Sequence, residues 1–177
     1  SGKWHLGFHE CPPPGFDWAF GMDRKINTHN GKIDYFFNGK KLTLEGNRSR
    51  HITAHALQFL EERPADRPFF LNVGYFATHS PFTEEKHDAA VVDLYRDAEF
   101  PEMPRTAPHP WSKPENGPPS EGFDEAEARK RWRGYFAAVT EIDREVERIL
   151  DYLEANQLLE DTLILYTADH GLCLGHH

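Results

Sequence analysis

Two short apolar runs, separated by one long amphipathic helix, constrain the fold of this chain more than any other feature. The runs are residues 69–76 and 162–167, and their apolar residues are largely continuous rather than alternating with polar ones. Continuous runs of this length are typical of strands buried on both faces, as in a parallel sheet. The pattern therefore predicts two parallel strands, 69–76 and 162–167, with the intervening helix packed across them.

The intervening helix is predicted over 125–155. Asp124 and Glu127 have the spacing of a capping box at its start, and Asn156 is a suitable residue to end it. Between these ends the apolar residues recur every three or four positions, as one stripe: Trp132, Tyr135, Phe136, Val139, Ile142, Val146, Ile149, Leu150 and Leu153.

A shorter helix is predicted over residues 52–62, where Pro64 follows and prevents its continuation. The order helix, strand, helix, strand predicts an α/β layered fold with a mainly parallel sheet flanked by helices. Residues 33–37, followed by Asn38-Gly39, predict a small β-hairpin. Proline-rich residues 100–123 are expected to form an extended surface loop within a single domain, 1–177.

Composition excludes some partners. The formal net charge of −9 argues against nucleic acid, which needs a surplus of Lys and Arg. No apolar run approaches the roughly 20 residues of a membrane span. Cys11 and Cys173 are too few for a disulfide framework. There is neither an initiator Met nor a signal-peptide pattern, so we expect a domain truncated at both ends, and the sequence leaves localisation open.

Three polar clusters are candidates for chemistry. Asp169-His170-Gly171 follows a predicted strand, where ligands collect in open α/β sheets, and offers a carboxylate and an imidazole to a metal. The alternative is a turn in which Asp169 caps the next helix. Lys3 and His5 flank Trp4, so an extended backbone would point both toward one oxyanion. The alternative is a pair of solvated surface residues.

His79 follows the other predicted strand, in the segment Thr78-His79-Ser80-Pro81, and its alternative reading is a loop histidine bonded to nearby backbone. Asp143 lies beside the apolar stripe and is expected to make a buried structural hydrogen bond. Other histidines have no comparable context and are interpreted as surface or structural residues: His9, His29, His51, His55, His87 and His109.

Taken together, these motifs resemble those of the type I sulfatases of the alkaline phosphatase superfamily. The order and approximate spacing agree over nearly the whole chain. The resemblance rests on four segments: Gly2-Lys3-Trp4-His5-Leu6-Gly7, 68–71 running into Thr78-His79-Ser80-Pro81-Phe82, 135–153, and 162–175.

The resemblance implies a role for each site residue. Lys3 and His5 would bind the sulfate group, and His5 would also act on the hydroxyl of the family's formylglycine nucleophile. His79 would contact the sulfate near the leaving oxygen. Asp169 and His170 would be metal ligands, with His170 standing where relatives carry Asn or His. The metal implied is calcium, which favours oxygen ligands, so the imidazole leaves its identity open.

The sequence departs from the family pattern at the nucleophile. Formylglycine is made from the Cys or Ser of a Cys/Ser-x-Pro-x-Arg motif that precedes Gly-Lys-x-His, and no such motif is present. Cys11 is followed by proline, but Gly15 stands where Arg is required and the order is wrong. The family's N-terminal aspartate pair and C-terminal lysine are also missing. We therefore expect the isolated chain to be inactive and to bind no calcium tightly.

The resemblance implies a sulfate ester as substrate, either a small molecule or a sulfated carbohydrate. Alternatives are a phosphodiesterase, phosphonate hydrolase or phosphotransferase of the same superfamily, or a non-catalytic module. Many family members are periplasmic, secreted or lysosomal. Apolar surface at a truncated edge is expected to favour self-association.

Overall fold

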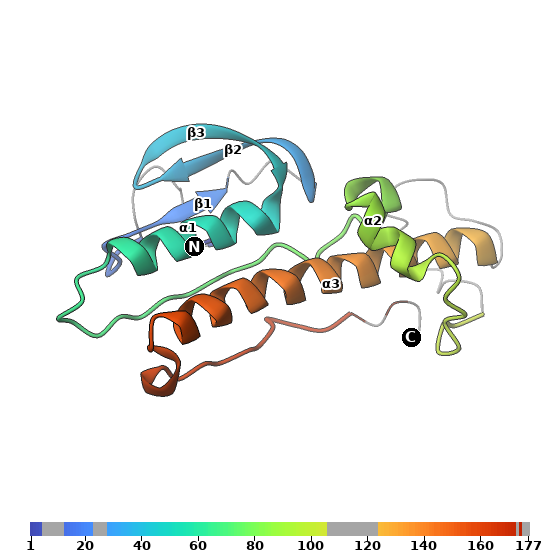
Figure 1. The fold of residues 1–177 in the computed structure, drawn as a ribbon. Coiled ribbons are helices and arrows are strands. Elements are labelled where there is room, and N and C mark those ends of the chain that lie inside the picture. The colour runs from blue at the N-terminus through green and yellow to red at the C-terminus, as the bar shows by residue number, and fades with distance from the viewer. Residues whose placement is uncertain (5–12, 23–27, 106–123, 173, 175–177) are drawn as a thin grey trace.

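The computed structural model describes residues 1–4, 13–22, 28–105, 124–172 and 174. Helices and strands follow one another along the chain as β1 (Phe20–Met22), β2 (Asn30–Phe37), β3 (Lys40–Asn47), α1 (Arg48–Glu62), η1 (Glu84–Lys86), α2 (Ala89–Val92), η2 (Asp93–Tyr95), α3 (Glu125–Ala155) and η3 (Leu159–Asp161). Figure 1 shows the sheet above α1, and α3 running the length of the molecule. No helix among the described residues is long and apolar enough to cross a membrane.

The three strands form an antiparallel sheet in the order β1-β2-β3. β2 and β3 are the predicted hairpin, and their turn is Asn38-Gly39, with φ of 46° and 81°. Positive φ at both turn positions is what a tight two-residue hairpin requires, and Asn and Gly adopt it most readily. The Asn38 side chain also accepts a hydrogen bond from the backbone N–H of Ala19, at 2.8 Å, which attaches the turn to the residue before β1.

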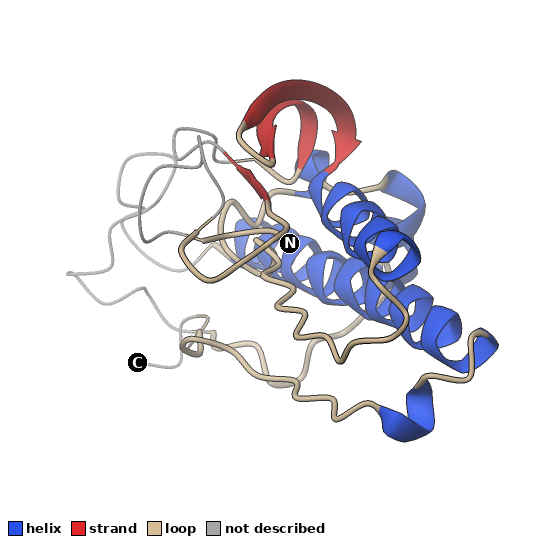
Figure 2. Ribbon diagram, turned by 90° about the vertical axis from the view of Figure 1, so that its left-hand side faces the viewer, coloured by secondary structure: helices blue, strands red, loops and turns tan. Residues whose placement is uncertain are grey.

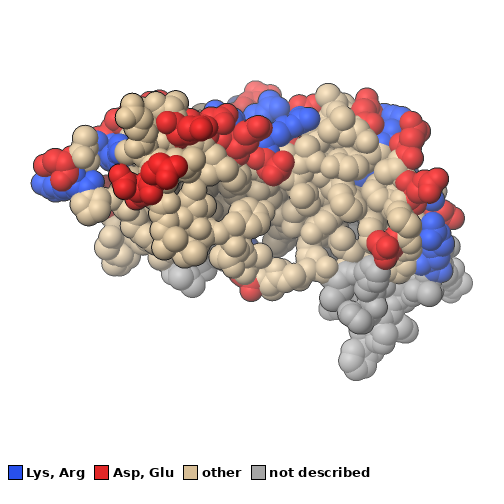
Figure 3. Space-filling model, turned by 60° about the horizontal axis from the view of Figure 1, so that its bottom comes forward, with Lys and Arg blue, Asp and Glu red and all other residues tan. Residues whose placement is uncertain are grey.

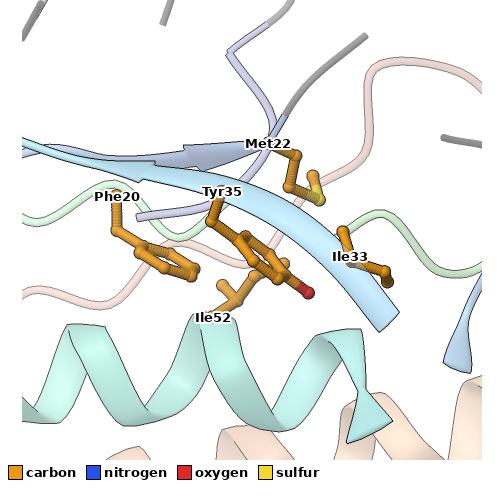
Figure 4. Close-up of a cluster of buried hydrophobic side chains, with 5 residues drawn as sticks. All are labelled: Phe20, Met22, Ile33, Tyr35 and Ile52. Atoms are coloured by element: carbon orange, nitrogen blue, oxygen red, sulfur yellow. The ribbon is translucent and has the colours of Figure 1, made fainter. Parts of the chain in front are cut away.

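The main core lies between this sheet and α1. Figure 4 shows side chains from β1 and β2 directed at the helix, where they meet Ile52. The five residues at its centre are Phe20, Met22, Ile33, Tyr35 and Ile52. α1 begins at Arg48, four residues before the predicted start, because the Asn47 side chain accepts a hydrogen bond from the Arg50 N–H and caps it.

α3 has the predicted bounds. The Asp124 carboxylate accepts a hydrogen bond from the Glu127 N–H, at 3.1 Å, and Asn156 is the C-terminal cap. The helix packs against α1, α2 and η1. Near its start Trp132 joins Phe100 and Met103 in a second apolar cluster. Beyond residue 105 the predicted proline-rich loop falls outside the described residues.

The predicted strands 69–76 and 162–167 are extended but belong to no sheet among the described residues. Figures 1 and 2 show both segments running in the same direction along one side of α1 and α3. Their parallel direction is as predicted, but they are not hydrogen bonded to each other. One isolated parallel bridge, between Gly2 and Gly74, is the only strand-like pairing of either run in the described structure. The sheet that does form is antiparallel, and its strands β2 and β3 are joined by a tight turn, which only antiparallel strands allow.

Candidate active site

Backbone pairing joins the first residues of the chain to the segment that leads into His79. The Lys3 N–H donates to the Gly74 carbonyl at 2.7 Å, and the Gly74 N–H donates to the Ser1 carbonyl at 2.8 Å. A Cβ on Gly74 would lie 2.7 Å from the Lys3 oxygen, so the approach requires glycine there. The structure thus places Lys3 beside the run 69–76, while His5 lies outside the described residues.

His79 occupies the loop that follows this run. Its N–H donates to the Phe76 carbonyl at 2.9 Å, and its ring stacks on the Phe76 ring with centroids 4.7 Å apart. Nδ1 lies 2.8 Å from the Ser80 carbonyl oxygen. Because a carbonyl only accepts hydrogen bonds, Nδ1 carries the proton, and Nε2 is the ring nitrogen through which neutral His79 can gain a proton.

α3 supports the far end of this loop. Gly134 lies against the Phe82 backbone so closely that an added Cβ would be 2.1 Å from the Phe82 oxygen. The Phe82 and Tyr135 rings meet edge to face with centroids 5.9 Å apart. Arg133 pairs with Glu84 just beyond the loop. The loop that carries His79 is therefore held between the run 69–76 and one face of α3.

Asp169 and His170 are exposed, with 78% and 65% of their side chains accessible. Asp169 Oδ1 accepts a hydrogen bond from the His170 N–H at 3.1 Å, and His170 Nδ1 lies 3.1 Å from the Gly171 carbonyl oxygen. Among the described residues, no group of three or more His, Cys, Asp or Glu side chains is arranged to hold a metal. This pair supplies one carboxylate and one imidazole, whereas calcium takes six to eight oxygen ligands.

A buried polar cluster beside His79 was not predicted as part of the site. His29 and His87 are 2% and 5% exposed, which confirms a structural rather than a surface setting for these two. His87 Nδ1 donates to the Glu141 carboxylate at 3.2 Å, and the Asp88 N–H donates to its other oxygen at 3.0 Å.

The prediction for Asp143 is wrong, because its side chain is exposed. The buried acids of α3 are Glu141 and Glu145, two residues to either side. Glu141 lies three residues beyond the buried Ala138, and Glu145 lies four residues beyond Glu141. Helical periodicity from Ala138 would therefore have predicted both on the buried face.

The pKa values of His29 and Glu141 both lie below their ordinary values, for different physical reasons. Burial is the largest cause, and the neighbouring His87 the next, of a shift that lowers the pKa of His29 to about 3. Burial alone would raise the pKa of Glu141, but the hydrogen bonds from His87 and the Asp88 backbone outweigh it and lower the pKa below its ordinary value. His29 is therefore neutral and Glu141 ionised near neutral pH.

Comparison with known proteins identifies the family of this chain. The sulfatase family model matches residues 1–177, and the chain belongs to the sulfatase family. Sulfatases belong to the alkaline phosphatase superfamily, and the α/β fold of this chain agrees with that assignment.

Two relatives and one solved structure illustrate the match. Human iduronate 2-sulfatase is 34% identical over 148 residues, which are 72% of this chain and 26% of that protein. The multifunctional alkaline phosphatase superfamily protein PehA of Trinickia caryophylli is 31% identical over 156 residues, 77% of this chain and 30% of that protein. A structure solved with its substrate D-glucosamine-2-N,6-O-disulfate has a TM-score of 0.68 at 18% identity, covering 90% of this chain and 44% of that one. The chain thus spans under a third of the length of these two relatives.

Proposed function

We propose that the full-length protein containing this chain is a sulfuric ester hydrolase, and that Lys3 and His79 act on its substrate. The observation that carries this proposal is the backbone pairing of residues 1–3 with 72–74. It attaches the segment bearing Lys3 to the run that leads into His79, five residues beyond Gly74. A cation and an imidazole on segments joined in this way suit a sulfate ester, which is anionic and whose leaving oxygen needs a proton when the alcohol is a poor leaving group.

Each residue has a distinct part in this proposal. The Lys3 ammonium binds sulfate oxygens and stabilises the negative charge that shifts as the ester bond breaks. In its imidazolium form, with a proton on each ring nitrogen, His79 donates the Nε2 proton to the leaving alcohol oxygen and becomes neutral, while its bond to the Ser80 carbonyl keeps the other proton on Nδ1. His5, two residues beyond Lys3, is the second sulfate-binding group.

Asp169 and His170 are proposed ligands of a divalent cation, calcium by resemblance to the family. Such a cation would act as a Lewis acid that neutralises sulfate charge. The described residues supply too few oxygen ligands to complete a calcium site, so no step is assigned to it. The formylglycine nucleophile is likewise expected to be encoded upstream of Ser1, where a Cys/Ser-x-Pro-x-Arg motif would identify it. Without these groups the isolated chain is inactive.

A sulfated carbohydrate is the proposed substrate class. Support comes from similarity to iduronate 2-sulfatase and from the likeness in fold to a protein solved with a disulfated glucosamine. A second candidate is hydrolysis of a phosphate or phosphonate ester, which the 31% identity to the multifunctional protein PehA favours.

The test compares His79→Ala with the wild-type full-length enzyme on alkyl and activated aryl sulfates. Alkyl alcohols are poor leaving groups and need protonation, so we expect His79→Ala to lower their kcat by about a hundredfold and to affect aryl sulfates far less. His51→Ala, which changes a histidine on α1, is the control and should leave both rates unchanged. Equal losses on the two classes would remove His79 from the leaving-group role. Faster turnover of phosphate diesters than of every sulfate ester would favour the second candidate.

A further inference from the structure

The rings of His29 and His79 both contact the Phe76 ring, and the ring of His87 contacts that of His29. The His29 and His87 rings are 4.6 Å apart, and the Phe76 ring lies 5.2 Å from His29 and 4.7 Å from His79, measured between centroids. The proposed reaction uses only His79. The question is what the two buried imidazoles beside it do.

His29 makes a direct hydrogen bond to the backbone of His79. Its Nε2 lies 2.7 Å from the His79 carbonyl oxygen. A carbonyl oxygen only accepts, so His29 Nε2 is the donor. The bond joins residues 50 positions apart, and the imidazole that makes it is almost fully buried. It therefore fixes the peptide unit on the C-terminal side of His79 from within the protein.

His29 is itself held from two sides. The Arg48 N–H donates to the His29 carbonyl at 2.9 Å, which fixes its backbone at the start of α1. Its ring packs against His87, whose Nδ1 is bonded to the buried Glu141 carboxylate of α3. The donor is thus anchored to both principal helices, and it restrains a loop that also rests on α3.

We propose that His29 is a positioning residue for His79: its hydrogen bond to the His79 carbonyl fixes the loop so that Nε2 of His79 is directed at the leaving oxygen of the substrate. This inference rests on the proposed role of His79 as the group that protonates that oxygen. Burial keeps His29 neutral near pH 7, with its single ring proton on Nε2, so the donor persists through the physiological range. A general acid misplaced by about 1 Å can cost about a hundredfold in rate, so such a restraint has a measurable effect.

The experiment measures kcat and KM of the full-length enzyme on one alkyl and one activated aryl sulfate, for four single variants. His29→Leu removes the donor and keeps much of the volume. His29→Gln places an amide N–H near the position of Nε2, whereas His29→Asn places it nearer that of Nδ1. His51→Leu is the matched control, because His51 Nε2 also bonds to a backbone carbonyl, that of Glu45 at 3.0 Å, but in the sheet.

We expect His29→Leu to lower kcat on the alkyl sulfate by at least about tenfold and to leave KM within about twofold of the wild-type value. Its kcat on the aryl sulfate should stay within about threefold of the wild-type value. His29→Gln should recover most of the alkyl rate and His29→Asn should not. The control should match the wild type on both substrates. Should His29→Leu fail to fold, the comparison of Gln with Asn decides the question, because both keep a polar side chain of similar size.

Three results for His29 would overturn the inference. An equal loss on both substrate classes for His29→Leu, or equal rates for the Gln and Asn variants, would make His29 purely structural. The third is the absence of any loss for His29→Leu. If His79→Ala itself shows no difference between substrate classes, the proposed role of His79 fails and this inference fails with it. A selective loss for His79→Ala without one for His29→Leu removes only the role of His29.

Discussion

Burial sets the protonation of His29 in spite of its polar surroundings. The loss of hydration is the largest influence on its pKa, and the nearby His87 acts in the same direction. The hydrogen bond to the His79 carbonyl opposes this shift but does not reverse it. A neutral imidazole is accordingly part of the folded state, and the cost of charging it appears as a dependence of stability on pH.

We expect the full-length protein to lose stability as pH falls from 7.5 to 5. The folded-state pKa of His29, about 3, lies below its ordinary value of 6.5, so the unfolded state binds more protons between these values. The contribution of neutral His29 to the free energy of unfolding is therefore present above pH 6.5 and is lost as the pH falls from 6.5 toward 3. The loss between pH 7.5 and 5 is about 2 kcal/mol. The ionised Glu141 acts in the same direction, but only near and below its ordinary pKa of 4.5.

Urea unfolding at pH 7.5 and at pH 5 measures this effect. His29→Gln cannot titrate, so its loss of stability between the two pH values should be smaller than that of the wild type by about 2 kcal/mol. Parallel losses in the two proteins would show that His29 is not the residue responsible.

Lys3 gives a second prediction at the residue scale. In the full-length enzyme, Lys3→Ala should lower kcat more than it raises KM, because sulfate charge is redistributed as the ester bond breaks. A cation about 4 Å from that charge contributes about 4 kcal/mol at an effective dielectric of 20, which is about a thousandfold in rate. Steady-state kinetics on a single sulfate ester measures both constants. A change in KM alone would mean that Lys3 binds substrate and transition state equally.

At the scale of elements, α3 determines where the loop of His79 can lie. The loop rests on α3 at Gly134, where only a residue without a side chain allows the Phe82 backbone to approach. The Phe82 ring then packs on Tyr135. α3 also carries Glu141, one and a half to two helical turns beyond these contacts, which bonds to His87. One helix thus supports both the loop and the buried histidines behind it.

Gly134→Ala tests this contact. In an exposed helix the change would stabilise by about 1 kcal/mol, because alanine favours helix. Here the added Cβ would meet backbone at 2.1 Å, so either the loop or the helix must move. We expect the variant to be destabilised by about 1–3 kcal/mol. Thermal unfolding of the full-length protein measures it, with Glu147→Ala, an exposed position of α3, as control. A stabilised Gly134→Ala would contradict the close approach.

At the scale of the whole molecule, one face carries apolar side chains that the described residues leave uncovered. Leu163 and Leu165 are 86% and 82% exposed. The next residue along the chain, Tyr166, is 78% exposed. Figure 3 turns this side toward the viewer and shows few charged residues across its middle. Apolar groups on both sides of an extended run are typical of a strand that is covered on both faces.

We expect the isolated chain to self-associate through this face. Leu163→Lys combined with Leu165→Glu should reduce the association, because burying either charge in an apolar contact is costly. Sedimentation velocity over a tenfold range of concentration, about 10 to 100 µM, measures it. Leu94→Lys, at an apolar residue on η2 that is 60% exposed, is the control and should leave association unchanged. A clean monomer for the wild-type chain at the highest concentration would rule the expectation out.

The sequence by itself determined the elements whose signals are local. Asp124 and Asn156 bound α3 because a capping side chain bonds to backbone only a few residues away. Asn38-Gly39 fixed the hairpin because its turn needs positive φ at two adjacent positions. The motifs around Lys3, His79 and Asp169 indicated the sulfatase family, which the comparisons bear out, whereas the roles of these residues remain predictions.

Only the tertiary structure decided which residues lie together. The hydrogen bond from His29 to His79 spans 50 positions, and the one from His87 to Glu141 spans 54. Neither follows from spacing, because the pairing depends on how α1, α3 and the run 69–76 pack. The same reason explains the extended runs. Both runs are extended, but neither is a strand of the predicted parallel sheet. Hydrogen bonding into a sheet requires a partner strand at one edge or both, and that is a property of the assembled layers rather than of the run itself.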